Sequence, residues 1–153
     1  MPIEISLLAD RPDLIDQLVE GYQDWSPTWY GPGGRGDARA DLAARVQRDA
    51  IPCGIVAADG PLAVGTCALA SESMSQTLET GAWLVGLWVR PSHRRQGVAS
   101  RMVKAAEAQA AALRIGEVRV GTVAAAIFQR AGWVHHGAAL HDGRLIEMFY
   151  FKP

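Results

Sequence analysis

The sequence predicts a single α+β domain with a mixed sheet of about six to seven strands, mostly antiparallel, flanked by about four helices. Two observations carry this prediction. The Asp-Gly pairs at 59–60 and 142–143 each separate two β-rich segments, which is a typical hairpin signal. An apolar strand at 82–89, an Ala-rich helical pattern at 97–115 and a short strand at 117–121 form a β-α-β unit, so these two strands should run parallel.

The remaining elements follow from hydrophobic periodicity. Alternation predicts a first strand at 3–7, and helical spacing predicts an amphipathic helix that ends near Tyr22 and has Asp10 as its N-cap. Gly116 is expected to cap the helix at 97–115. The other predicted segments are a loop at 26–36, a weaker helix at 37–48, strands at 51–58 and 62–70, an irregular stretch at 71–80, a helix at 123–131 and a closing hairpin of 134–140 and 145–151.

Composition and charge exclude several classes of protein. The 153 residues suit one domain spanning 1–153, and 49% hydrophobic with 20% charged residues indicates a globular chain. A net charge of −1 gives no overall attraction to nucleic acid or to an anionic membrane. The chain shows neither a secretory-signal pattern nor a long apolar span. Cys53 and Cys67 lack metal-type spacing and are expected to be buried thiols, so no metal is expected and a cytoplasmic location follows by elimination.

The segment Arg94–Ala99 is the most informative about function. It joins the apolar strand to the Ala-rich helix, and the first turn of a helix has free amides and positive potential that accept phosphate oxygens. Gly97 leaves the main chain open to a ligand, and Arg94 and Arg95 add cationic donors. A solvated basic helix start is the alternative. Gly97 among the arginines favours a site for a pyrophosphate-bearing ligand.

The pattern Arg-x-x-Gly-x-Ala at 94–99, after a strand that ends at Val89, resembles the acyl-CoA signature of the GCN5-related N-acetyltransferase (GNAT) superfamily. The segment 124–133 resembles that family's late helix, which ends in Gly followed by an aromatic residue. The resemblance implies the GNAT fold, with acetyl-CoA as co-substrate. The implied cofactor-binding residues are Leu87, Trp88, Val89, Arg94, Arg95, Gln96, Gly97, Val98, Ala99, Ser100 and Phe128.

The resemblance also implies how the strand at 82–89 meets the ligand. Amides from Arg95 to Ser100 would grip the pyrophosphate, and the pantetheine arm would pair with the main chain of residues 87–89. This requires the strand to diverge from the strand at 117–121, and Gly86 fits a bulge at that point. A main-chain N–H near Trp88 or Val89 is the natural donor to the oxyanion of the reaction.

The proton-transfer part of the family pattern is missing. Many members carry Tyr where this chain has Phe128, and many carry Glu within the strand that corresponds to 82–89, which here contains no carboxylate. Glu79, His135 and Tyr150 are the remaining candidates for catalysis. Each also has a structural interpretation, as a solvated loop residue, an exposed edge histidine and an ordinary strand aromatic. Water is an alternative partner for the departing thiolate.

The segment Gly31–Gly36 matches G-x-G-x-x-G but is not a dinucleotide fingerprint. It follows a helix and contains proline, whereas the fingerprint must follow a strand and open a helix. The resemblance implies that this loop borders the acceptor pocket. Trp29 and Tyr30 would then form an aromatic lid over that pocket, although both alternatively cap the core.

These features predict an N-acetyltransferase that moves an acetyl group from acetyl-CoA to a primary amine of a small molecule or, less favoured, of a peptide or protein. The main alternative is a non-catalytic acyl-CoA sensor or interaction module on the same fold, because the usual Tyr and Glu are absent. A different phosphate ligand at 94–100 is a further alternative. Neither nucleic acid nor a membrane is expected as a partner, and a homodimer remains open.

Overall fold

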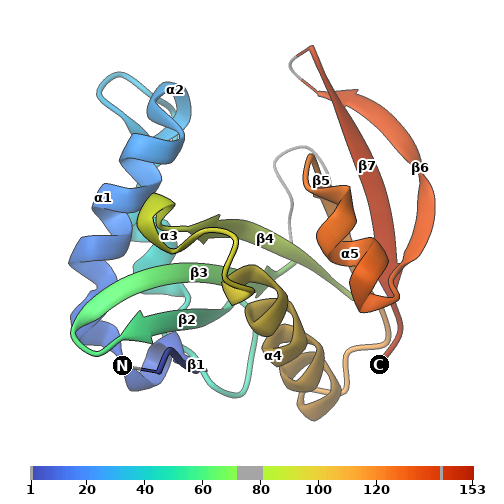
Figure 1. Cartoon of the computed structure of the whole chain (residues 1–153), viewed down its shortest axis with the longest axis horizontal. Coiled ribbons are helices and arrows are strands. Elements are labelled where there is room, and N and C mark those ends of the chain that lie inside the picture. Colours follow the sequence, from blue (N-terminus) through green and yellow to red (C-terminus); the bar gives the residue numbers. More distant parts are fainter. Residues whose placement is uncertain (1, 72–80, 142) are drawn as a thin grey trace.

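A computed structural model describes residues 2–71, 81–141 and 143–153. It shows one seven-stranded sheet in the order β1-β2-β3-β4-β5-β7-β6 (Figure 1). Neighbouring strands are antiparallel except β4 and β5, which run parallel as the β-α-β unit predicts. The strands are β1 (Glu4–Leu7), β2 (Cys53–Asp59), β3 (Leu62–Ala70), β4 (Ala82–Val89), β5 (Val118–Thr122), β6 (Val134–His141) and β7 (Arg144–Phe151).

Two hydrophobic clusters cover opposite faces of the sheet. One packs α4 and α5 against β2 to β5 and β7, and the other packs α1 and α3 against β2 and β3 and against Trp88 of β4. The α-helices are α1 (Ile15–Trp25), α2 (Pro27–Tyr30), α3 (Ala38–Ala44), α4 (Val98–Ala112) and α5 (Ala125–Ala131). Short 3-10 turns cover Leu8–Asp10, Pro12–Leu14 and Pro91–His93. This is the predicted α+β architecture.

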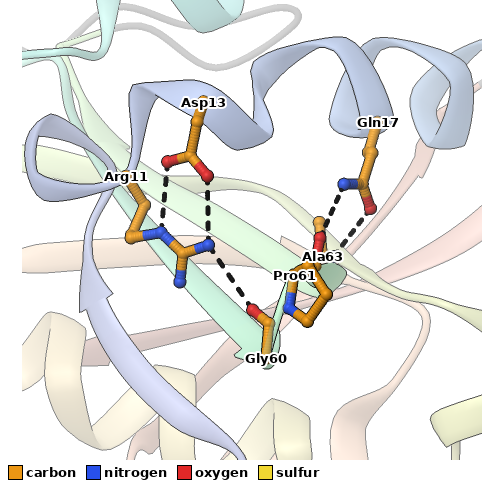
Figure 2. Close-up of polar contacts among 6 residues, drawn as sticks. All are labelled: Arg11, Asp13, Gln17, Gly60, Pro61 and Ala63. Atoms are coloured by element: carbon orange, nitrogen blue, oxygen red, sulfur yellow. Dashed lines mark hydrogen bonds and ion pairs between the residues drawn. The ribbon is translucent and has the colours of Figure 1, made fainter.

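The start of α1 is anchored by side chains that reach the β2–β3 turn, as Figure 2 shows. Arg11 donates to both Asp13 carboxylate oxygens at 3.1 Å and to the Gly60 carbonyl at 3.4 Å. Gln17 donates to the Pro61 carbonyl and accepts from the Ala63 amide, both at 2.8 Å. This anchoring fixes the start of α1 to the β2–β3 turn, and the helix packs from there on the face of the sheet that carries Trp88.

The predicted cap of the first helix is wrong. Asp10 ends a 3-10 turn and forms an ion pair with Arg48, while Leu14 occupies the N-cap of α1 without a side-chain hydrogen bond. The ion pair draws the carboxylate away from the helix start. The hydrogen bond from Arg48 is also the main reason that the pKa of Asp10 is lowered.

Three other local predictions also need correction. The segment expected to be a loop contains the one-turn helix α2, with Pro27 in its first turn, where proline is favourable. The weak helix α3 starts as predicted, with the Asp37 side chain accepting from the Ala40 amide at 3.0 Å, but ends at Ala44. Helix α4 ends before Gly116, because Arg114 itself takes the left-handed conformation (φ 57°).

None of the helices in the described ranges is long and apolar enough to cross a membrane.

Candidate active site

The loop between β4 and α4 presents a run of free main-chain amides. Arg95 (φ 63°) and Gly97 (φ 79°) are left-handed, and α4 begins at the next residue, Val98. No hydrogen bond recorded among the described residues uses the N–H groups of residues 95–100. No atom lies within 4 Å of where a Cβ would stand on Gly97. Amides arranged in this way, with a helix dipole behind them, form an anion-binding concavity.

The side chains of this loop leave the amides accessible. Gln96 and Gly97 are exposed, and Ala99 and Ser100 are half-buried. Val98 is only 2% exposed and packs in the core, so it has only its main chain to offer a ligand. Residues expected to grip the ligand are therefore together and reachable through their backbone.

Two arginines beside the loop are held by main-chain carbonyls. Arg94 Nε donates to the Val89 carbonyl at 2.9 Å, and Arg90 Nε donates to the Ala63 carbonyl at 2.7 Å. Arg94 and Arg95 are both exposed. The hydrogen bonds anchor two of the positive charges at the C-terminal end of β4, beside the amide run.

Strand β4 separates from β5 shortly after it begins. The parallel pairing covers only Ala82↔Val118 and Trp83↔Arg119. Beyond that point β4 stays paired with β3 on its other side, as far as Val89. The β5-facing edge of residues 84–89 therefore has no strand partner in the described chain. This is the divergence that the pantetheine-pairing hypothesis requires.

A bulge interrupts β4 at Gly86, where the sequence suggested one. Gly86 has φ 62°, and the register with β3 shifts between Thr66 and Ala68. The Tyr22 hydroxyl of α1 donates to the Gly86 carbonyl at 2.7 Å, and Arg45 Nη1 donates to the Tyr22 hydroxyl at 2.8 Å. A Cβ on Gly86 would stand 2.3 Å from that hydroxyl oxygen, so only glycine fits.

The sequence patterns did not indicate Tyr22 or Arg45 as neighbours of the site. Tyr22 is fully buried and Arg45 is 7% exposed. Burial raises the pKa of Tyr22, so its hydroxyl keeps the proton it donates. Although burial opposes the Arg45 charge, the nearby Tyr22 and Tyr30 raise the pKa of Arg45, which stays cationic. The only sequence feature that pointed to either residue was the position of Tyr22 on the apolar face of the first helix.

The predicted ligand-binding residues of β4 alternate between the two faces of the sheet. Trp88 is 4% exposed and packs in the α1–α3 cluster, where its ring would stand 2.5 Å from a Cβ on Gly21. Leu87 and Val89 are half-buried and pack against the α4–α5 cluster. Their side chains are thus used for packing, and what they offer to a ligand is the open main-chain edge.

Phe128 of α5 is completely buried. Its ring centroid lies 5.0 Å from that of Trp133 in an edge-to-face arrangement and 6.0 Å from that of Phe149. Packing therefore explains why an apolar ring stands at this position. Phenylalanine has no hydroxyl, so this residue cannot donate a proton.

The proposed proton-transfer residues lie apart. His135 pairs with Glu147 at 2.5 Å, and its ring contacts Phe149 edge-to-face at 5.2 Å. Tyr150 follows Phe149 along β7, so its side chain points to the opposite face, where the His136 ring lies 5.9 Å away. His135 and Tyr150 are therefore on different faces of the β6–β7 hairpin. Glu79 lies outside the described residues.

The two proposed lid residues occupy α2. Trp29 and Tyr30 are half-buried and contact each other edge-to-face at 6.4 Å, and the Tyr30 hydroxyl donates to Asp41 at 2.8 Å. Tyr30 lines a cavity of about 600 Å³ between α1 and the start of α3, whereas Trp29 is not among the residues that line it. The cavity walls are the side chains of Asp16, Val19, Glu20, Gln23, Tyr30, Asp37, Ala38 and Arg39, with Gly36.

A second cavity of about 400 Å³ lies beside the loop between β4 and α4. Glu20 lines both cavities, so they share a wall on α1. The residues around the second cavity are Gln17, Glu20, Gly21, Asp24, Trp25, Trp88, Arg90, Pro91 and Arg94. It therefore connects the carboxylates of α1 with the C-terminal end of β4.

An amide run that is unbonded in the described chain, beside a strand that opens away from its parallel neighbour, is the arrangement that the resemblance to the GNAT superfamily implies. The model of the acetyltransferase (GNAT) family matches residues 18–133, which is most of the chain. The protein therefore belongs to the GNAT acetyltransferase family. No curated protein matches the sequence.

Solved structures share this fold at low sequence identity. An N-acetyltransferase from Staphylococcus aureus Mu50 has a TM-score of 0.78 and 15% identity, with 99% of each chain covered. An aminoglycoside 6'-acetyltransferase type Ii has a TM-score of 0.75 and 18% identity, covering 99% of this chain and 97% of that one. A putative acetyltransferase from Salmonella typhimurium, solved with acetyl-CoA, has a TM-score of 0.76 and 15% identity, covering 99% and 94%.

Proposed function

We propose that this protein transfers the acetyl group of acetyl-CoA to a primary amine of a small molecule. The observation that carries the proposal is the amide run at residues 95–100, which stands beside the point where β4 leaves β5. The first feature suits a diphosphate, and the second offers main-chain groups to an extended, amide-containing chain such as pantetheine. Membership of the acetyltransferase family and a solved relative that holds acetyl-CoA support the same ligand.

In this proposal the chain supplies binding and orientation. The amides of residues 95–100 hold the diphosphate, and Arg94 and Arg95 add positive charge beside them. The main chain of residues 87–89 pairs with the pantetheine arm, and the Trp88 N–H donates to the oxyanion that forms during attack. A donor of this kind typically contributes about 3 kcal/mol to transition-state stabilisation.

The acceptor amine must lose a proton before it attacks. A lysine-like amine with a pKa of about 10.4 is only about one part in a thousand neutral at pH 7, so a base accelerates the reaction. We propose Glu79, His135 and Tyr150 as the groups that handle protons. Glu147 holds the His135 ring, which is how a carboxylate orients a histidine base. His135 and Tyr150 lie on opposite faces, so they serve as alternatives rather than as a pair.

The carboxylates around the larger cavity support a small, cationic acceptor. Asp16, Glu20 and Asp37 line that cavity and outnumber the cation Arg39, which pairs with Asp16 at 2.7 Å. Carboxylates attract protonated amines, and their concentration on α1 contrasts with a net charge of only −1 for the chain. We place the reaction in the cytoplasm, in agreement with two free, buried cysteines.

The proposal is tested by measuring free thiol released from acetyl-CoA across a panel of small amines, with the matching alcohols as controls. We expect enzyme-dependent thiol release with at least one amine and none with its alcohol analogue. Acetyl-CoA binding without turnover on any amine would instead indicate a sensor. Competition by ATP or NAD, but not by CoA, would indicate a different phosphate ligand.

A further inference from the structure

Helix α1 contacts β4 at the Gly86 bulge and again two residues later, at Trp88. Gly21 allows the Trp88 ring to pack directly on the helix, since a Cβ there would stand 2.5 Å from the ring. The next residue, Tyr22, donates its hydroxyl proton to the Gly86 carbonyl at 2.7 Å. Two consecutive residues of α1 therefore contact residues 86 and 88, in the part of β4 where its register with β3 shifts.

The Tyr22 hydroxyl is itself oriented by a buried cation. Arg45, just after α3, donates to the hydroxyl oxygen at 2.8 Å, and its guanidinium lies 5.7 Å from the centre of the tyrosine ring. With its oxygen accepting from Arg45, the hydroxyl has its proton free for the Gly86 carbonyl. Hydrogen bonds linked in series polarise one another in a low-dielectric interior, so the two bonds act as one unit.

We infer that Tyr22 and Arg45 are positioning residues for acetyl transfer: they hold the Gly86 bulge and thereby aim the main-chain groups of residues 87–89 at the thioester. This inference rests on the proposed function. Neither side chain touches the reacting atoms. A carbonyl bound by a side chain cannot swing freely, so the orientation of the peptide groups that follow it is set before the ligand arrives.

The test compares Tyr22→Phe with Thr66→Val. The first change removes only the hydroxyl and keeps the ring that stacks on Tyr30 at 5.2 Å. The matched control removes another fully buried hydroxyl, that of Thr66 in β3, which donates to the Ile55 carbonyl of β2 at 2.7 Å. Both variants lose one buried hydroxyl-to-carbonyl hydrogen bond, and only Tyr22→Phe releases Gly86.

We expect Tyr22→Phe to lower kcat about 10- to 100-fold, as small misplacements of reacting groups do, with the KM for acetyl-CoA within about twofold. Thr66→Val should keep kcat within about twofold of the original protein. Arg45→Met should also lower kcat, and the double variant should be no slower than Tyr22→Phe alone, because residues that act through one unit are not additive. Independent, multiplying losses would overturn the inference.

Amide hydrogen exchange gives a readout that needs no turnover. Tyr22→Phe should accelerate exchange at residues 86–88 relative to β2, and Thr66→Val should not produce this local change. If the original protein acetylates no amine, the proposed function fails, and the exchange data still decide whether the pair holds the bulge. Unchanged exchange at 86–88 in Tyr22→Phe refutes the positioning role, whatever the activity.

Discussion

The two ends of the sheet differ in how deeply their strands are buried. In β2 and β3 almost every residue is buried, because helices cover both faces, whereas β6 is exposed along nearly its whole length. The β6–β7 hairpin stands at the end of the molecule opposite α1 (Figure 1). The Gly86 bulge and the amide run lie in and after β4, which is the middle strand of the sheet and adjoins this buried end, whereas His135 and Tyr150 belong to the hairpin.

This difference predicts a difference in rigidity. Packing on two faces holds groups within a fraction of an ångström, as a binding site requires. Strands with few buried contacts open at lower free energy, so the hairpin should open more readily than β2 and β3.

Gly97→Glu should have the largest effect, because it places a carboxylate in the amide run that we propose holds the diphosphate. We expect CoA affinity to fall by at least about 100-fold, since two like charges about 4 Å apart near a protein surface repel by about 4 kcal/mol. Gly137→Glu in β6 is the matched control. It also has positive φ (116°) and no neighbour within 4 Å of a Cβ. Calorimetry should find its CoA affinity unchanged within about twofold; equal losses would contradict the assignment of the loop.

Truncating one leucine at each end should separate their contributions to stability. Leu69 of β3 is fully buried and Leu140 of β6 is 77% exposed. Leu69→Ala should lower the free energy of unfolding by about 2–5 kcal/mol, and Leu140→Ala should change it by less than about 0.5 kcal/mol. Urea denaturation measures both. A loss above about 1 kcal/mol for Leu140→Ala would mean that another surface covers the hairpin.

The smallest expected signal is thiol labelling. Burial raises the pKa of Cys67 to about 12, so only about one part in ten thousand is thiolate at pH 8. Burial also raises the pKa of Cys53, so the folded protein should resist iodoacetamide at both sites. Ala139→Cys adds an exposed thiol in β6 and should be modified rapidly under the same conditions. Mass spectrometry reports each site, and rapid modification of Cys67 would show that the buried end opens.

Local patterns predicted much of this molecule correctly. The strand, glycine loop and helix around Gly97 lie where periodicity placed them, and the bulge at Gly86 and the divergence of β4 from β5 are confirmed. The N-cap prediction failed because Arg48, distant in sequence, captured the Asp10 carboxylate. A sequence pattern evaluates only near neighbours, so it does not register a competing partner of that kind.

The amino-acid sequence alone determined the order of the elements and the amide run before α4. These depend on glycine conformation, helix starts and hydrophobic spacing, all of which act between residues close along the chain. Only the tertiary structure joined Tyr22, Arg45 and Gly86 and separated His135 from Tyr150. Contacts between distant segments form when the two faces of the sheet are covered, and that packing is a property of the whole fold.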